Sequence, residues 1–340
     1  MLPNTFGIES GAKRFVVVHS EEELREFVGR YNLSGGATSE EPLLIVGAGS
    51  NMVFTRDYPG TVLHMANKGI RLLEDYGQGT DSARTVFVEA AAGEVWDDFV
   101  RHCIAQGWYG AENLVAIPGT VGAAPVQNVG AYGKEAKDII HQVHTVDTVT
   151  GETRDFSNEE CRFGYRNSFF KSEEGKRYVV VSVVFRLQRD FTPDLSYKAL
   201  REAVASRGLS SPTPEQLADL IAEVRWSKLP RPEETGSAGS FFKNPVVPVS
   251  QYEALKVQYP DLVAFAVGDG YKLAAGWLIE RAGWKGRTLG RCGVYEKQAL
   301  VLVNRGGCTG AEVVLLADSI IADVKEKFGV TLVPEAIIVN

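Results

Sequence analysis

Apolar residues in the first hundred positions recur in a way that predicts two small α/β units, one after the other. Ser20 followed three residues later by Glu23 is the pattern of a capping box, which predicts that a helix begins there. The apolar pattern of 96–105 predicts a second helix, which Gly107 terminates. Short apolar runs predict strands at 14–18, 43–46 and 86–90.

The pattern changes to strand-forming between residues 143 and 189. Thr150 and Gly151 predict a turn between two of the expected strands. Valine, isoleucine, threonine and aromatic residues predict strands at 143–149, 153–156 and 178–187. This block therefore belongs to an α+β domain.

Helical patterns dominate the second half of the chain. Pro214 at a first helical position and Gly329 beyond a last one mark helix ends, and 229–232 (Leu-Pro-Arg-Pro) predicts a linker. Helices are expected at 213–227, 250–258, 273–282 and 311–328, and strands at 299–303 and 331–339. We predict domains at 1–75, 76–228 and 229–329, with the final strand, 330–340, returning to the first domain.

Composition narrows the class of protein. The chain has 340 residues, 44% hydrophobic and 23% charged, and a net charge of −7. A chain of this length is too long to fold around one ordinary hydrophobic core, so we predict a multidomain enzyme. With no long apolar span, basic leader or Lys/Arg cluster, we expect a cytoplasmic protein that binds neither membrane nor nucleic acid. The cysteines show no Cys-x-x-Cys spacing, so we expect all of them to be reduced and mostly buried: Cys103, Cys161, Cys292 and Cys308.

Two glycine-containing segments carry the candidate chemistry. Residues 47–51 (Gly-Ala-Gly-Ser-Asn) follow an apolar strand, so their amides can form a concave anion site. A dinucleotide-binding Rossmann fingerprint would need a third glycine where Met52 stands, so we reject that fold; an ordinary turn remains the alternative. Residues 112–133 crowd small, uncharged residues together and can pass beside a large flat ligand.

Residues 117–133 (Ile-Pro-Gly-Thr-Val-Gly-Ala-Ala-Pro-Val-Gln-Asn-Val-Gly-Ala-Tyr-Gly) resemble a motif of the UDP-N-acetylenolpyruvoylglucosamine reductases, the MurB family. Further blocks at 161–171, 236–245 and 332–335 resemble segments of the same family. The presence of Tyr197 makes the chain resemble the type I branch of that family. Ala48, Ala123 and Ala124 depart from the polar residues common in relatives. The resemblance implies an α+β fold: a two-lobed FAD-binding region of the vanillyl-alcohol-oxidase-like type and a C-terminal α+β substrate-binding domain.

The resemblance also implies ligands and site residues. It implies noncovalent FAD, NADPH as hydride source, and reduction of UDP-N-acetylglucosamine enolpyruvate to UDP-N-acetylmuramate in peptidoglycan precursor synthesis. The implied FAD-binding residues are Gly47, Ala48, Gly49, Ser50, Asn51, Ile117, Pro118, Gly119, Thr120, Gly122, Gln127, Asn128, Gly130, Ala131 and Tyr132. The implied substrate-binding residues are Tyr165, Tyr197, Lys228, Asn244, Lys272 and Gln298.

Three residues are expected to carry the reaction. Arg166 suits the charge that develops on the substrate carboxylate, because a guanidinium is permanently protonated and binds two oxygens. Ser240 is implied as the proton donor, held by a glycine-containing loop. Glu335 stands in an apolar segment that we expect to be a strand, and it is implied as a partner of Arg166 or of the enol intermediate.

Other interpretations remain open at this point. Another flavin oxidoreductase of the same fold is one, and a non-catalytic nucleotide-binding regulator is the other. His141 and His144 have a spacing that fits a metal pair, but no further ligand is near them in the sequence, so no metal is assigned. No obligate protein partner is inferred.

Overall fold

The computed structural model describes residues 1–38, 40–75 and 84–340 and divides into two compact units. Unit 1 consists of Met1–Gly11, Gly49–Tyr58 and Lys228–Asn340, and unit 2 of Ala12–Ala48 and Pro59–Ser227. The predicted boundary near residue 75 adjoins residues 76–83, which lie outside the described residues. The division into three domains therefore stays a prediction.

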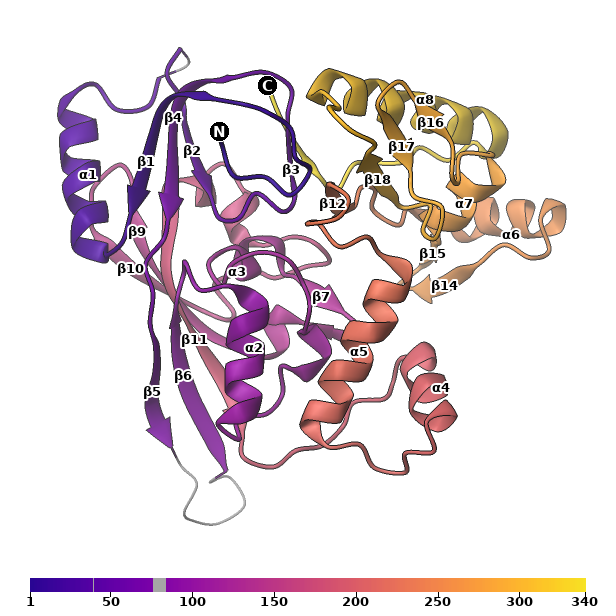
Figure 1. Cartoon of the computed structure of the whole chain (residues 1–340), viewed down its shortest axis with the longest axis horizontal. Coiled ribbons are helices and arrows are strands. Elements are labelled where there is room, and N and C mark those ends of the chain that lie inside the picture. The colour runs from indigo at the N-terminus through magenta and orange to yellow at the C-terminus, as the bar shows by residue number, and fades with distance from the viewer. Residues whose placement is uncertain (39, 76–83) are drawn as a thin grey trace. The chain divides into compact units, whose positions relative to one another are not determined.

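An antiparallel five-stranded sheet forms the centre of unit 2, in the order β10-β9-β11-β6-β5 (Figure 1). One helix, α2 (Trp96–Ala105), packs on it through Trp96 and Phe99, whose rings lie 5.9 and 4.5 Å from that of Phe185. The strands are β5 (Ile70–Asp75), β6 (Thr85–Ala91), β9 (Ile140–Asp147), β10 (Thr153–Ser157) and β11 (Tyr178–Gln188).

A smaller sheet of unit 2 has the order β1-β4-β2, with β2 parallel to β4. Strand β1 is followed by α1 (Glu21–Leu33), where the Ser20 hydroxyl accepts a hydrogen bond from the amide of Glu23 over 3.1 Å. This confirms the predicted helix cap. The strands are β1 (Ala12–Val18), β2 (Leu43–Val46) and β4 (Tyr58–Met65).

Short elements complete unit 2. The helices α3 (Ala123–Gln127) and α4 (Lys198–Ser206) were not predicted, whereas α5 (Pro214–Lys228) begins at the proline as expected. The others are β7 (Gly130–Ala131), β8 (Lys134–Glu135) and the 3-10 helices η1 (Glu112–Leu114), η2 (Ala136–Asp138), η3 (Phe169–Lys171) and η4 (Gly175–Arg177).

Unit 1 has its own core, which α8 (Gly310–Phe328) and α7 (Ala275–Arg281) help to enclose. Thr309 and Glu312 form the capping box of α8, and Gly329 ends it at φ 66°. The sheets have the orders β12-β18-β17-β16, β13-β15-β14 and β19-β3. The remaining elements are β3 (Met52–Phe54), β12 (Ser237–Ser240), β13 (Val246–Pro248), α6 (Val249–Gln258), β14 (Ala264–Val267), β15 (Gly270–Leu273), β16 (Thr288–Leu289), β17 (Cys292–Val294), β18 (Val301–Asn304) and β19 (Ile337–Val339). In the described part of the chain, no helix is both long and apolar enough to cross a membrane.

The predicted last strand, 331–339, is wrong in its first half. Only β19 pairs, in parallel, with β3. Pro334 forms a single bridge with Phe242, and since proline has no amide hydrogen it cannot continue a ladder. Glu335 therefore lies before the strand, half-buried, and not within it.

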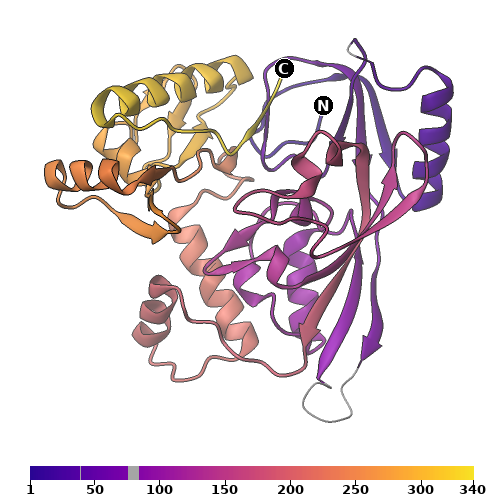
Figure 2. The same cartoon turned by 180° about the vertical axis from the view of Figure 1, so that it is seen from behind.

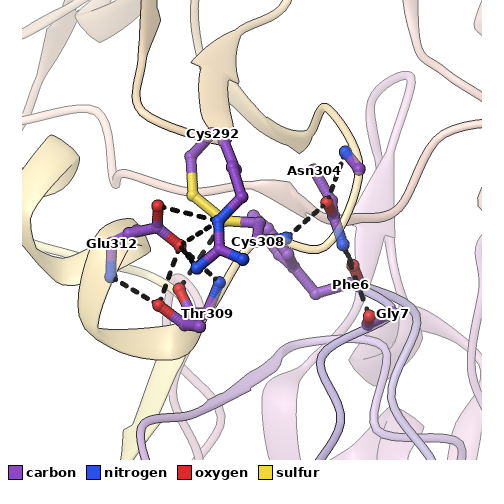
Figure 3. The surroundings of a disulfide bond; sticks show 9 residues. Phe6, Gly7, Cys292, Asn304, Cys308, Thr309 and Glu312 are labelled. Atoms are coloured by element: carbon purple, nitrogen blue, oxygen red, sulfur yellow. Dashed lines mark hydrogen bonds and ion pairs between the residues drawn. A yellow bond between two sulfur atoms is a disulfide. The ribbon is translucent and has the colours of Figure 1, made fainter.

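The prediction of four reduced cysteines is also wrong. Cys292 on β17 and Cys308 before α8 form a disulfide, with Cα atoms 5.6 Å apart (Figure 3). A turn between β18 and α8 brings them together, and the sequence separation of 16 residues does not reveal this. Asn304 stabilises the turn: its side chain accepts from the amide of Cys308 over 3.0 Å and donates to the carbonyl of Phe6 over 3.0 Å.

Cys103 and Cys161 are free and buried, as expected. Burial raises the pKa of the Cys161 thiol to about 12, and it raises the pKa of the Cys103 thiol as well. Neither thiol is therefore ionised near neutral pH.

His144 links α1 to the edge of the five-stranded sheet, whose strands Figure 2 shows from behind. Its Nε2 lies 2.9 Å from a Glu21 carboxylate oxygen, and its Nδ1 contacts the carboxylate of Asp155. These residues line a cavity of about 620 Å³ that includes none of the predicted site residues. His141 instead packs edge-on against Phe87, so the two histidines have different partners.

Replacing His144 with glutamine should reduce stability at acidic pH. Burial opposes the imidazolium, but the hydrogen bonds to Asp155 and Glu21 prevail and raise the pKa of His144. A raised pKa stabilises the fold fully below the unfolded value of about 6.5, and this contribution is lost as pH rises through the folded pKa. We expect a loss on the order of 1 kcal/mol at pH 5.5 that shrinks by pH 9, measured by urea unfolding. His141→Gln is the control, and a loss independent of pH would contradict the assignment.

Candidate functional site

Arg166 lies at the tip of a tight turn in unit 2. Gly164 and Asn167 exchange backbone hydrogen bonds of 2.9 and 3.1 Å, which leaves Tyr165 and Arg166 as the two central residues. Arg166 has φ 51°, a left-handed conformation that is costly for a residue with a side chain. Such strain is commonly found at functional sites.

The guanidinium of Arg166 is bound to the carbonyls of the glycine-containing segment. It donates to Gly130 O over 2.9 Å and to Asn128 O over 3.4 Å. Asn128 in turn donates to Gly164 O over 2.9 Å, so each segment holds the other. The Asn128 side chain also bonds to Glu135 and to the amide of Lys137, so both its amide nitrogen and its oxygen have partners within unit 2.

Lys171 adds a connection that the sequence did not reveal. Its ammonium group donates to Gln127 Oε1 over 2.6 Å and to Arg166 O over 3.1 Å. Lys171 is the last residue of the 161–171 block, but nothing in the sequence pattern indicates these contacts.

The glycine-containing segment has the features of a cofactor cradle. The side-chain nitrogen of Gln127 is buried and, among the residues described, has no hydrogen-bond partner. A Cβ on Gly47 would lie 2.5 Å from Thr120 Oγ1, so the two segments approach closely. A buried, unpaired donor beside crowded backbone fits a group rich in oxygen acceptors, as FAD is. The other predicted FAD-binding residues of unit 2 are Ala48, Ile117, Pro118, Gly119, Gly122, Ala131 and Tyr132.

The first loop is divided between the units, because Gly49, Ser50 and Asn51 belong to unit 1. Gly49 has φ 64°, and a Cβ there would lie 2.0 Å from Pro3 O, so only glycine fits. Asn51 donates from its side chain to the carbonyl of Glu335 over 3.2 Å.

Ser240 and Glu335 are brought together in unit 1. The amide of Glu335 donates to the carbonyl of Phe241, the residue after Ser240, over 2.7 Å. Phe241 and Phe242 are fully buried and anchor this contact. Among the residues described, none forms a hydrogen bond with the Ser240 hydroxyl, which is half-buried and therefore available to a substrate.

Three predicted substrate-binding residues gather near the start of α7. The Asn244 side chain accepts from the amide of Ala275 over 2.9 Å, and Lys272 is on the strand just before this helix. A Cβ on Gly276 would lie 3.0 Å from Gln298 Oε1. Lys228 lies elsewhere in unit 1, exposed at the end of α5.

Tyr165 and Tyr197, the predicted substrate-binding tyrosines, belong to unit 2 and are 43% and 47% exposed. The guanidinium carbon of Arg166 lies 5.4 Å from the centre of the Tyr165 ring. Both rings are therefore accessible to a ligand.

Arg225 on α5 is a candidate site residue that the sequence did not reveal. Its Nε is buried with no hydrogen-bond partner in the described part of the chain. Burial lowers the pKa of Arg225, the nearby Tyr132 opposes this, and the charge of Arg166 adds to it. The two guanidiniums therefore repel each other electrostatically. No motif marks Arg225, because only the fold brings it close to Arg166.

Comparison with known proteins identifies the family and the fold. The family profile described as "UDP-N-acetylenolpyruvoylglucosamine reductase, C-terminal domain" matches residues 231–339, and that of an FAD binding domain matches residues 12–157. These matches confirm the predicted fold class and cofactor.

Curated relatives match almost the whole chain. A UDP-N-acetylenolpyruvoylglucosamine reductase of Pseudomonas fluorescens (strain Pf0-1) is 48% identical over 330 residues, which cover 97% of this chain and 94% of the relative. That of Pseudomonas aeruginosa (strain ATCC 15692) is 46% identical over 333 residues, covering 98% and 95%. The crystal structure of the enzyme from Thermus caldophilus has the same fold, with a TM-score of 0.64 at 23% identity over 99% of this chain and 96% of that one. Since relatives at nearly half identity match almost the whole length, this chain belongs to the UDP-N-acetylenolpyruvoylglucosamine reductase family.

Proposed function

We propose that this chain uses Arg166, Ser240 and Glu335 to reduce UDP-N-acetylglucosamine enolpyruvate to UDP-N-acetylmuramate in the cytoplasm. The family assignment makes it an FAD-dependent reductase of peptidoglycan precursor synthesis with NADPH as reductant. The observation that supports the proposed roles most directly is the Arg166 turn. Its backbone is strained, and its guanidinium donates to the carbonyls of the glycine-containing segment. Bound FAD would carry hydride from NADPH to the substrate.

Arg166 would bind the substrate carboxylate. When hydride adds to the terminal methylene carbon, electrons move toward the neighbouring carbon and the carboxylate. A guanidinium can bind both carboxylate oxygens and stabilise this charge without itself losing a proton. The carbonyls of Gly130 and Asn128 hold the group in place, so little reorganisation is needed during the reaction.

Ser240 would then give its hydroxyl proton to the neighbouring carbon. Serine is a weak acid, but the carbanion is a strong base, and the buried Phe241 and Phe242 hold the serine backbone firmly. Glu335 would assist the enol intermediate from a backbone position fixed by Phe241 and Asn51. Asn244, Lys272, Gln298 and Lys228 would bind the nucleotide portion of the substrate.

A spectral titration tests the proposal. Purified protein should be yellow, NADPH should bleach the flavin absorbance, and the enolpyruvyl sugar nucleotide should restore it under anaerobic conditions. Heat or acid denaturation should release free FAD, because the sequence motifs assign no histidine or cysteine to a covalent bond with the flavin.

Two outcomes would contradict the proposal. Flavin that NADPH bleaches but that only an alcohol or sugar reoxidises would indicate another oxidoreductase of the same fold. Nucleotide binding without any change in absorbance would indicate a regulator.

A further inference from the structure

We propose that Asn113 and the Lys134–Asp194 ion pair are positioning residues, which hold the Tyr197 segment in place for the sugar nucleotide. The inference rests on the proposed function for the role of Tyr197. The contacts themselves lie wholly within unit 2.

Asn113 joins two distant segments through one amide group. Its Nδ2 donates to Tyr132 O over 3.0 Å and to Asp194 O over 3.0 Å. The residue is 2% exposed, so water does not readily replace these bonds, and the loss of a buried donor leaves two acceptors unsatisfied. Asn113 itself is fixed in η1, where Trp96 Nε1 donates to Leu114 O over 2.8 Å.

Asp194 is held from a second side. Its Oδ2 lies 3.5 Å from Lys134 Nζ, and its Oδ1 accepts from the amide of Ser196 over 2.9 Å. Burial opposes the charge, but Ser196 and Lys134 together lower the pKa of the Asp194 carboxyl. The carboxylate therefore remains ionised and shapes the turn that leads into Tyr197.

The two attachments place one tyrosine against another. The rings of Tyr132 and Tyr197 meet edge to face, with centroids 5.4 Å apart. Gly133 permits this approach, because a Cβ there would lie 2.7 Å from Ser196 Oγ. Arg201 closes the segment from the α4 side by donating to Leu195 O over 2.8 Å. Tyr197 is thus half-exposed on a backbone fixed at both ends.

Ordering this segment before the substrate arrives would reduce the entropy that binding costs. Lys134→Met should therefore raise the KM for the enolpyruvyl sugar nucleotide about tenfold, with kcat and the rate of flavin reduction by NADPH nearly unchanged. Lys134→Arg should restore the KM, since it keeps the charge. Asn113→Leu should raise this KM further than Lys134→Met does. If Asn113→Leu does not fold, Asp194→Asn replaces it as the second test variant. Lys176→Met, which removes an exposed ion pair with Glu173, is the matched control.

Limited trypsin digestion of the FAD-loaded protein gives a readout that does not depend on activity. Cleavage after Lys198 or Arg201 should be faster in Lys134→Met and Asp194→Asn than in the unmodified protein or the control. Unchanged cleavage would overturn the inferred attachment, and faster cleavage with an unchanged KM would overturn its role in binding. If the unmodified enzyme is never reoxidised by the substrate, the proposed function fails, whereas the attachment is still judged by the cleavage rates.

Discussion

Ser240→Ala should slow flavin reoxidation by the enolpyruvyl substrate by about two to four orders of magnitude, which corresponds to roughly 3 to 5 kcal/mol of barrier. The substitution removes the hydroxyl that would protonate the substrate carbon. Flavin reduction by NADPH needs no acid at that carbon, so that half-reaction should keep its rate. Stopped-flow absorbance measures the two halves separately.

The structure offers a control for this variant. Within the described residues, nothing accepts from or donates to the Ser240 hydroxyl, so its removal should cost little stability. Ser250→Ala, at an exposed position on α6, should leave both halves unchanged. Ser240→Cys should recover part of the loss, because a thiol can also give a proton. Equal slowing of both halves would mean that Ser240 shapes the site, and an unchanged reoxidation rate would remove it from the mechanism.

Arg166→Met should lower kcat/KM for the enolpyruvyl substrate by roughly 10² to 10³-fold, as expected when a group that stabilises developing charge is lost. Arg166→Lys should recover only part of this, since an ammonium keeps the charge but cannot bind both carboxylate oxygens in one plane. Both substitutions retain a Cβ, so the left-handed backbone stays equally strained.

Arg162→Met is the matched control for Arg166→Met. Arg162 is exposed, has φ 45°, and contacts the ring of Phe169, so it shares the residue type and backbone region without the carbonyl contacts. We expect near-normal kinetics from it. An equal loss in both variants would indicate a general effect on this segment and would contradict a specific role for Arg166.

Local pattern was a good guide wherever local forces decide the structure. The strand at 43–46 and the helix at 96–105 have the predicted bounds. Turn chemistry placed the helix ends at Ser20, Pro214 and Gly329 equally well. The motif resemblance correctly identified the family, but it did so through long blocks of residues and not through composition.

Two failures were local: the helices α3 and α4 were not predicted, and the last strand was extended across Pro334. The others concern contacts between distant segments, since the disulfide and the partners of Lys171 depend on which strands and loops lie side by side. Arg225 and Asn113 look like an ordinary helix residue and an ordinary turn residue in the sequence. Only the folded chain shows that one is buried with an unpaired nitrogen and that the other joins two loops.

The interrupted course of unit 1 has a consequence for the nascent chain on the ribosome. Residues 1–11 and 49–58 emerge early, yet the core they join is completed only by residues 228–340, and β3 must wait for β19. Until then Phe6, Ile8, Val53 and Phe54, all buried in the finished fold, stay without their packing partners. Unit 2 can fold in the meantime, because all its segments have been synthesised by Ser227. We therefore expect translation to pass through a stage in which one unit is complete and these early apolar residues are the ones that a chaperone would bind.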